Sequence, residues 1–147
     1  MVRLNNEMRQ NLSTLRFILK EACHADGCTT VTICPKQCGC RGRRTFKLNT
    51  ETSICWELGD RIYDLLRFDY DPTRRELNDL IDVARSYCNL SRFHMTRGWQ
   101  RFFNHVEQFI EAVCVYELTY SYFVYMRADE FLQKLKGSLK RLKREPK

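Results

Sequence analysis

The sequence lacks several patterns that would assign it to a common class of protein. Its 147 residues contain no glycine-rich loop of the kind that holds nucleotide phosphates, because the six glycines are scattered. Residues 1–20 are interrupted by charge every few positions and have no apolar segment typical of a secretory signal. The most apolar run, residues 112–126, contains Glu117 and is shorter than the roughly 20 residues that span a bilayer. We therefore expect an intracellular protein that is not secreted and has no membrane insertion.

No group of residues in the sequence resembles a complete active site. The C-x-x-C pair of a thioredoxin-like centre does not occur. Asp69 and Asp71 stand where loop and helix-cap residues are expected, and not as an acid/base pair. His105 lies between aromatic positions of a helical pattern, where a histidine is more often a core or surface residue than a catalytic one. We predict that the protein is not an enzyme.

The composition is that of a globular protein. Apolar residues make up 44%, aromatic residues 12% and charged residues 29% of the chain. This length suits a single domain, residues 1–147, that buries its own core. Within it, residues 1–50 are expected to form a helix and a cysteine-rich hairpin, and residues 51–147 an aromatic-rich helical part with a basic C-terminal helix.

The predicted fold is mainly α with a small β-hairpin near the N-terminus. The first helix is predicted from five apolar residues at spacings of three and four, namely Met8, Leu12, Leu15, Leu19 and Ala22. Residues 29–34 are short and rich in β-branched side chains, and residues 45–49 alternate in the manner of a strand. Together they predict a hairpin whose tip carries cysteines.

Two helices are predicted after the hairpin. The first begins with Thr52 or Ser53 as its cap and runs to about Phe68. The next begins after Asp71-Pro72, where Thr73 and Glu76 have the spacing of a capping box.

Aromatic residues dominate the second half of the chain. Their spacing from Trp99 to Val113 predicts a long helix, whereas the tyrosine- and valine-rich residues 113–125 suit either a helix or a strand. The aromatics cover more than one face of the predicted helix, which is typical of a helix that lies in the core or contacts another subunit. A final basic helix is predicted over residues 131–142.

Five cysteines and a histidine lie together in residues 23–40, CHADGCTTVTICPKQCGC. Zinc takes four thiolate or imidazole ligands, and tight turns bring pairs of such ligands together. The turn CPKQCGC, with its proline and glycine, resembles a zinc knuckle. We predict one structural zinc ion, a Zn2+ cofactor bound by four of five cysteines: Cys23, Cys28, Cys34, Cys38 and Cys40.

The identity of the four ligands stays open at this point. His24 and Cys55 are reserve candidates, the latter because it follows the hairpin in the first turn of a helix. The alternative is that the reduced cysteines pack as small hydrophobic side chains. Cys88 and Cys114 fall on apolar helix faces and are predicted to be core residues.

The net charge of +7 is concentrated in two basic patches on an otherwise mildly acidic chain. Residues 41–47 form one patch, next to the cysteines, and residues 134–147 form the other. Such patches either stay solvated or bind anions, and nucleic acid is a candidate partner.

The stretch CHADGCTTVTICPKQCGCRGR, followed by FHMTRGWQRFFNHVEQFI, resembles a small U-box/RING-like baculovirus protein associated with nucleocapsid assembly. The resemblance implies a protein of the infected host nucleus and the virion nucleocapsid that contacts other capsid or assembly proteins in a hetero-oligomeric complex. A RING holds two zinc ions through eight ligands in C-x2-C pairs, which this sequence does not contain. Ubiquitin-ligase activity is therefore not expected.

These observations predict a zinc-stabilised structural or assembly protein of a viral nucleocapsid that acts through protein–protein contacts. Two alternatives remain: a nucleic-acid-binding regulator that uses the patches 41–47 and 134–147, and a RING-like ubiquitin ligase. Binding that weakens steeply with salt would favour the nucleic-acid-binding alternative.

Overall fold

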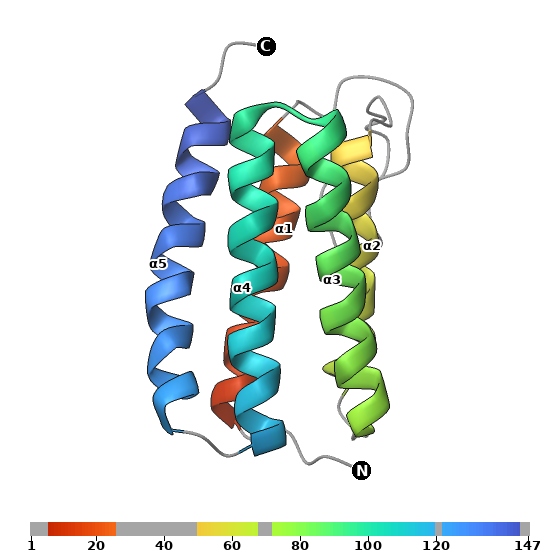
Figure 1. Ribbon diagram of the computed structural model, residues 1–147, viewed down its shortest axis with the longest axis vertical. Helices are drawn as coiled ribbons and strands as arrows, with labels where there is room; N and C mark the ends of the chain where they lie inside the picture. The colour runs from red at the N-terminus through yellow and green to blue at the C-terminus, as the bar shows by residue number, and fades with distance from the viewer. Residues whose placement is uncertain (1–5, 26–49, 68–71, 120–121, 145–147) are drawn as a thin grey trace.

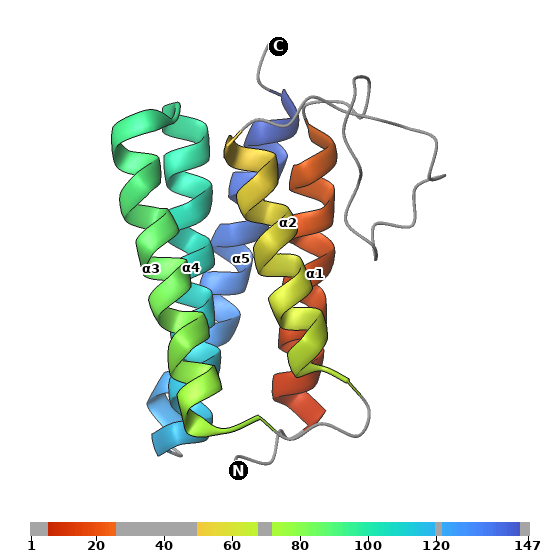
Figure 2. The same cartoon turned by 90° about the vertical axis from the view of Figure 1, so that its right-hand side faces the viewer.

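The computed structural model describes residues 6–25, 50–67, 72–119 and 122–144, which form a bundle of α-helices. The five helices are α1 (Asn6–Ala25), α2 (Thr50–Leu65), α3 (Arg74–His94), α4 (Arg97–Thr119) and α5 (Tyr122–Arg144). Each helix runs antiparallel to the next one along the chain (Figure 1). Helices α3, α4 and α5 form one layer, and α1 and α2 form a second layer beside it (Figure 2).

The β-hairpin of the predicted fold class is wrong, because the described residues contain helices and no strand. Residues 29–34 and 45–49, to which the hairpin was assigned, lie outside the described residues. The prediction rested on β-branched residues in one short segment and on an alternating pattern in the other, and the preference of such short segments for strands depends on their tertiary neighbours. Helices satisfy their own backbone hydrogen bonds and here cover one another's apolar faces, so the described core is built without a β-element.

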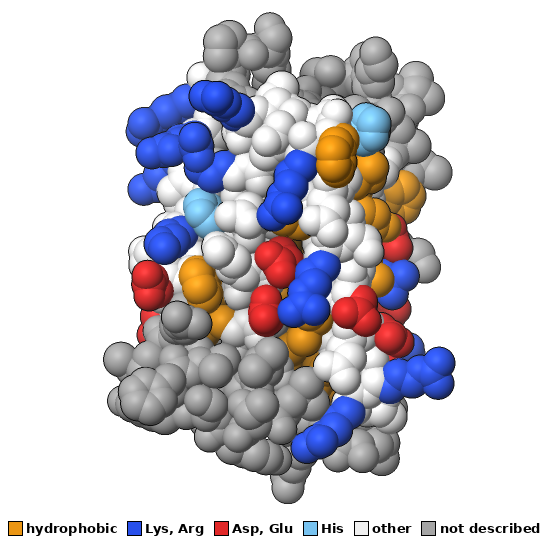
Figure 3. Space-filling view, viewed as in Figure 1, with side chains coloured by type: hydrophobic (Ala, Val, Ile, Leu, Met, Phe, Trp, Pro, Cys, Tyr) orange, Lys and Arg blue, Asp and Glu red, His pale blue; other side chains and the backbone are white. Residues whose placement is uncertain are grey.

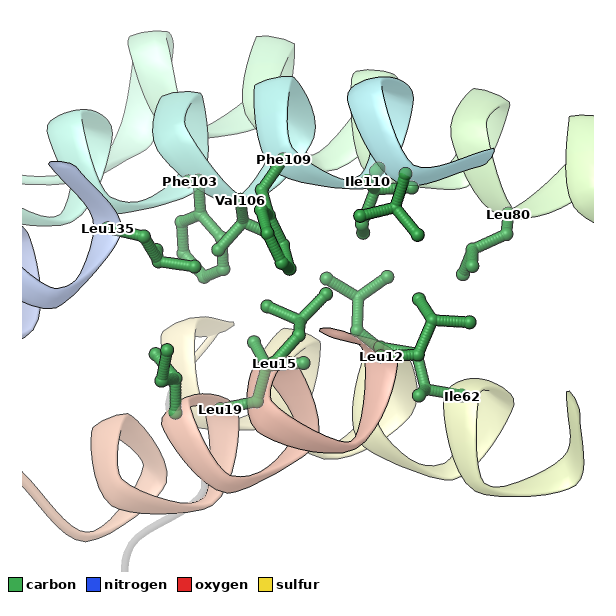
Figure 4. Packing of buried hydrophobic residues seen from close by; sticks show 14 of the residues in the cluster. Leu12, Leu15, Leu19, Ile62, Leu80, Phe103, Val106, Phe109, Ile110 and Leu135 are labelled. Atoms are coloured by element: carbon green, nitrogen blue, oxygen red, sulfur yellow. The ribbon is translucent and has the colours of Figure 1, made fainter. Parts of the chain in front are cut away.

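The core lies between the two layers and takes side chains from all five helices (Figure 4). The labelled leucines of α1 and Ile62 of α2 point toward α4, while Leu135 closes one side from α5. Several of these side chains are fully buried, including Leu12, Leu15, Leu19, Leu58, Ile62, Leu77, Phe102, Phe103, Phe109, Ile110 and Leu135. Each fully buried side chain of this size stabilises the fold by about 1.5–3 kcal/mol relative to its exposed state.

The aromatic residues at the start of α4 pack against one another inside the bundle. The ring of Trp99 lies 5.7 Å from those of Phe102 and Phe103, edge-on to the first and stacked on the second. The rings of Phe102 and Phe103 are 5.5 Å apart. All three residues are buried, so this part of the aromatic helix is core and not surface.

Two sequence predictions of helices are confirmed in detail. The apolar stripe from Met8 to Ala22 is the buried face of α1. Thr73 is the N-cap of α3, and its side chain and that of Glu76 form the predicted capping box. The Thr73 hydroxyl accepts from the Glu76 amide at 3.2 Å, and the Glu76 carboxylate accepts from the Thr73 amide at 3.2 Å.

Other helix boundaries differ from the predicted ones. Residues 113–125 contain the end of α4 at Thr119 and the start of α5 at Tyr122. Helix α2 begins at Thr50, before the predicted caps Thr52 and Ser53, and ends at Leu65. Among the described helices, none has an apolar stretch long enough to cross a membrane.

We predict that Phe109→Ala lowers the free energy of unfolding by about 3–5 kcal/mol, because the ring is fully buried and its loss leaves a cavity. Phe93→Ala is the matched control. Its side chain is 80% exposed, so a change within about 0.5 kcal/mol is expected. Denaturant unfolding followed by circular dichroism measures both values, and equal effects of the two substitutions would contradict the described core.

Candidate functional site

The predicted zinc ligands lie mostly outside the described residues. Cys28, Cys34, Cys38 and Cys40 fall in residues 26–49, which the structure does not describe. Cys23 and the reserve ligand His24 belong to the last turn of α1, but their side chains are not described either. No group of three or more histidine, cysteine, aspartate or glutamate side chains in the described part of the chain is arranged to hold a metal ion.

The three cysteines with described side chains are buried and form no disulfide. Cys88 and Cys114 are core residues, as predicted. Cys55, the other reserve ligand, is only 2% exposed and belongs to the core cluster. Burial raises the pKa of the Cys88 thiol, outweighing the opposite effect of Arg92. Cys88 is therefore kept as the protonated thiol, which is a poor nucleophile.

The most distinctive surface of the described residues is basic and lies on α5. Its inward positions are Leu132, Leu135, Ser138, Leu139 and Leu142, all buried. Its exposed positions carry six basic residues, Lys134, Lys136, Lys140, Arg141, Lys143 and Arg144. The 3.6-residue period of the helix thus separates the apolar and basic residues of the predicted C-terminal helix onto opposite faces.

Helix α4 extends this basic surface. Arg97 and Arg101 are exposed at the beginning of α4, which runs antiparallel to α5. The register of the two helices is visible at His105, whose Nδ1 lies 2.5 Å from Ser138 Oγ. One turn earlier on α4, Arg101 therefore comes opposite the turn of α5 that carries Arg141. Lys and Arg side chains gather over α5 and the adjoining end of α4, with a histidine beside them (Figure 3). We call Arg97, Arg101, His105 and the six basic residues of α5 the α4–α5 basic surface.

Few carboxylates neutralise this surface. Lys143 pairs with Glu21 of α1 at 2.5 Å, and Lys134 pairs with Glu130 of its own helix at 3.4 Å. Both pairs are half exposed, so each stabilises the fold by about 0–1 kcal/mol. No ion pair forms between the other six basic residues of this surface and any carboxylate of the described residues.

His105 is the one titratable group of this surface that is partly buried. Burial lowers its pKa, and the positive charges of Lys134, Arg101 and Arg141 lower it further. Ser138 Oγ donates its proton to the backbone carbonyl of Lys134 at 3.1 Å. Because a hydroxyl has a single proton, His105 donates Nδ1–H to Ser138 Oγ, and its Nε2 keeps a lone pair.

A second charged cluster joins α3 to α4. Arg85 bridges two carboxylates of α4, at 3.5 Å from Glu107 and 3.2 Å from Glu111. Burial raises the pKa of Glu107, and Glu111 raises it further against the effect of Arg85. One guanidinium is shared by two carboxylates in this cluster, which joins α3 to α4 as a packing contact between two helices.

A hollow of about 240 Å³ lies between the end of α2 and the beginning of α3. Its lining includes Arg61, Asp64, Glu76 and Asp79. Glu76 is occupied by the capping box, and Arg61 pairs with Glu57 at 3.1 Å. Glu76 and Arg61 are therefore engaged within their own helices.

Sequence reasoning identified the α5 part of the basic surface but not its α4 part. Arg97, Arg101 and His105 are spaced by four residues, which places them on one face of a helix. That spacing was a usable signal, but the pairing of this face with α5 depends on the tertiary register.

Comparisons of the chain with protein-family models, curated protein sequences and solved structures return no match. The function is therefore inferred from the chain's own residues.

We predict that the folded protein loses stability as the pH falls below about 6.5, the ordinary pKa of histidine, in part through His105. Its pKa is lowered in the folded state, so the unfolded chain binds the proton more readily in this range. His105→Gln should remove this part of the pH dependence, whereas His94→Gln, at an exposed position, should keep it. Denaturant unfolding at a series of pH values makes the comparison, and identical profiles for wild type and His105→Gln would contradict it.

We also predict that the purified chain binds about one zinc ion through four of the five cysteines between Cys23 and Cys40. Joint replacement of Cys34 and Cys38 by serine should remove the metal. Cys88→Ala should retain it, because that thiol is buried on α3. Elemental analysis by mass spectrometry measures the zinc content, and a metal-free wild-type protein purified without chelator would refute the prediction.

Proposed function

We propose that the protein is a non-enzymatic assembly module that holds nucleic-acid backbone against the α4–α5 basic surface. The resemblance to a nucleocapsid-assembly protein suggests the setting, a complex in which nucleic acid and protein meet. The observation that carries the proposal is the concentration of eight basic residues on two neighbouring helices with carboxylate partners for only two of them within the described residues.

The shape of this surface suits an extended polyanion. Lys136, Lys140 and Arg144 are spaced by four residues and form a row along α5. At 1.5 Å per residue the row is about 12 Å long, comparable to three or four phosphates of one strand at about 3.4 Å each. Arg97 and Arg101 widen the row toward α4. Flexible basic side chains on a rigid helix can follow a phosphate backbone without reading its bases.

Protein–protein contact through the aromatic helix has less support. The aromatic helix was predicted either to lie in the core or to contact another subunit, and Trp99, Phe102, Phe103 and Phe109 are all buried in the chain's own core. They are not accessible to a partner while the bundle is folded. The basic surface is accessible and is therefore the better basis for a function. An acidic partner protein would use the same charges and is distinguished from nucleic acid by experiment.

We predict that the full chain binds a fluorescently labelled single-stranded oligonucleotide with an affinity that falls as salt rises. The variant Lys136→Gln/Lys140→Gln/Arg144→Gln should bind more weakly, and its plot of log affinity against log salt should lose about 0.7 of slope for each lost phosphate contact. Fluorescence anisotropy over a range of salt concentrations measures the affinity and its slope.

The control is Arg67→Gln/Arg75→Gln, which removes two exposed charges near the start of α3, away from this surface. It should leave the slope unchanged. Equal losses in the two variants, or no binding by wild type, would overturn the proposal. Tighter binding to polyglutamate than to the oligonucleotide would assign the surface to an acidic protein instead.

A further inference from the structure

His105 lies near three basic residues that belong to two helices. Arg101 precedes it by one turn on α4, while Lys134 and Arg141 flank its partner Ser138 on α5, four residues before and three residues after. These three are the charged groups, from α4 itself and from the neighbouring α5, that act on the imidazole. The rest of the α4–α5 basic surface is exposed, so His105 is its one partly buried member.

The arrangement holds the imidazole in a defined orientation. Nδ1 donates to Ser138 Oγ, and Ser138 donates to the Lys134 carbonyl, so the chain of hydrogen bonds ends in the backbone of α5. Ser138 is 3% exposed, which makes this a built contact and not a chance meeting of two surface side chains. With Nδ1 engaged, only Nε2 can gain a proton.

We propose that Arg101, Lys134 and Arg141 bind one phosphate group of the nucleic-acid backbone beside His105, and that this binding is accompanied by uptake of one proton at His105 Nε2. The site deepens the proposed function and rests on it. The proton comes from solvent. His105 keeps its Nδ1–H, which stays hydrogen-bonded to Ser138 Oγ, and no covalent bond in the protein or the phosphate is broken.

Phosphate suits the site better than a carboxylate because it offers several acceptor oxygens to three donor side chains. Arginine guanidinium groups bind phosphate in a bidentate manner, and two of the three basic residues at this site are arginines. Neither Arg101 nor Arg141 forms an ion pair with a carboxylate among the residues described, so the exposed pair of Lys134 with Glu130 is the ion pair that must rearrange to admit the anion.

The coupling between phosphate and proton follows from electrostatics. In the free protein, burial and three positive neighbours disfavour a charged imidazole and hold the His105 pKa below its ordinary value. A bound phosphate offsets those charges and raises that pKa. By linkage, the phosphate then binds more tightly to the protonated protein, so the affinity increases as the pH falls through the His105 pKa of the complex. The phosphodiester itself keeps its charge over this range.

The first experiment measures the His105 pKa by NMR in the full chain, with and without a short oligothymidylate at constant ionic strength. We expect the pKa to rise on binding, by about one unit if the affinity gains tenfold. Oligonucleotide affinity, measured by anisotropy from about pH 8 to about pH 5.5, should increase by the same factor. Because the NMR titration uses the wild-type protein, it does not depend on the folding of any variant.

The second experiment compares matched variants. His105→Gln should lose the increase in oligonucleotide affinity that wild type shows between about pH 8 and about pH 5.5. His94→Gln, on the exposed end of α3, should keep it. Arg101→Gln/Arg141→Gln should weaken binding and shrink the pKa change of His105 on adding oligonucleotide.

The outcomes separate this proposal from the one on which it rests. Salt-dependent binding with an unchanged His105 pKa overturns the phosphate site at His105 and leaves the proposed function standing. Absence of binding overturns both. A pKa rise of equal size with polyglutamate at matched charge also overturns the phosphate site, because it shows that the site responds to any nearby anion.

Discussion

The burial of α4 among the other helices is the constraint on which the rest of the structure depends. Its aromatic side chains fill the space between the two layers, and Phe102, Phe103 and Phe109 are fully buried there. Because a packed core of large rings allows little sliding, the position of α4 along its axis is fixed. Helix α5 then packs against it in one register, with Ser138 opposite His105. The chemistry of the surface is thus set by the packing of the core, since a shift of one turn would separate Arg101 from Arg141.

Helical periodicity also explains why the charge gathers on one side. Leucines at positions 132, 135, 139 and 142 must point inward for α5 to bind the bundle, so the lysines and arginines between them must point outward. On α1, a buried apolar stripe is paired instead with an outer face of mixed charge. The difference between the two helices lies in the residues at their exposed positions, which the core does not dictate. Because the core does not determine the residue types at exposed positions, the residues found there give information about binding.

The helical part of the fold was accessible from the sequence because its signals are local. The stripe of α1 and the capping box of Thr73 and Glu76 act within a few residues, and both were predicted correctly. The break between α4 and α5 was not located, because residues 113–125 contain neither glycine nor proline to mark the turn. The hairpin was assigned from two short segments, one rich in β-branched residues and one with an alternating pattern, and the preference of such segments for strands depends on tertiary neighbours. The combination of Arg101, His105 and Arg141 was missed for a related reason, since it exists only through the register of α4 and α5, and Arg141 lies more than 30 residues along the chain from the other two. Four of the five candidate cysteines lie outside the described part, and their prediction rests on their spacing in the sequence.

The positions of the basic residues relative to the helix ends indicate that part of the basic surface does not stabilise the fold. Arg141, Lys143 and Arg144 lie in the last turn of α5, where positive charge interacts favourably with the helix dipole and needs no functional explanation. Arg97 is different, because it occupies the first position of α4, where the dipole disfavours a cation and where no acidic residue is present. Each such unfavourable charge costs about 0.3–1 kcal/mol, and repulsion from the basic end of α5 adds to that cost. The buried aromatic core offsets it many times over. Unfavourable charges of this kind are expected on a surface that binds an anion. The core compensates their cost in the free protein, and the same charges become stabilising once the anion is bound.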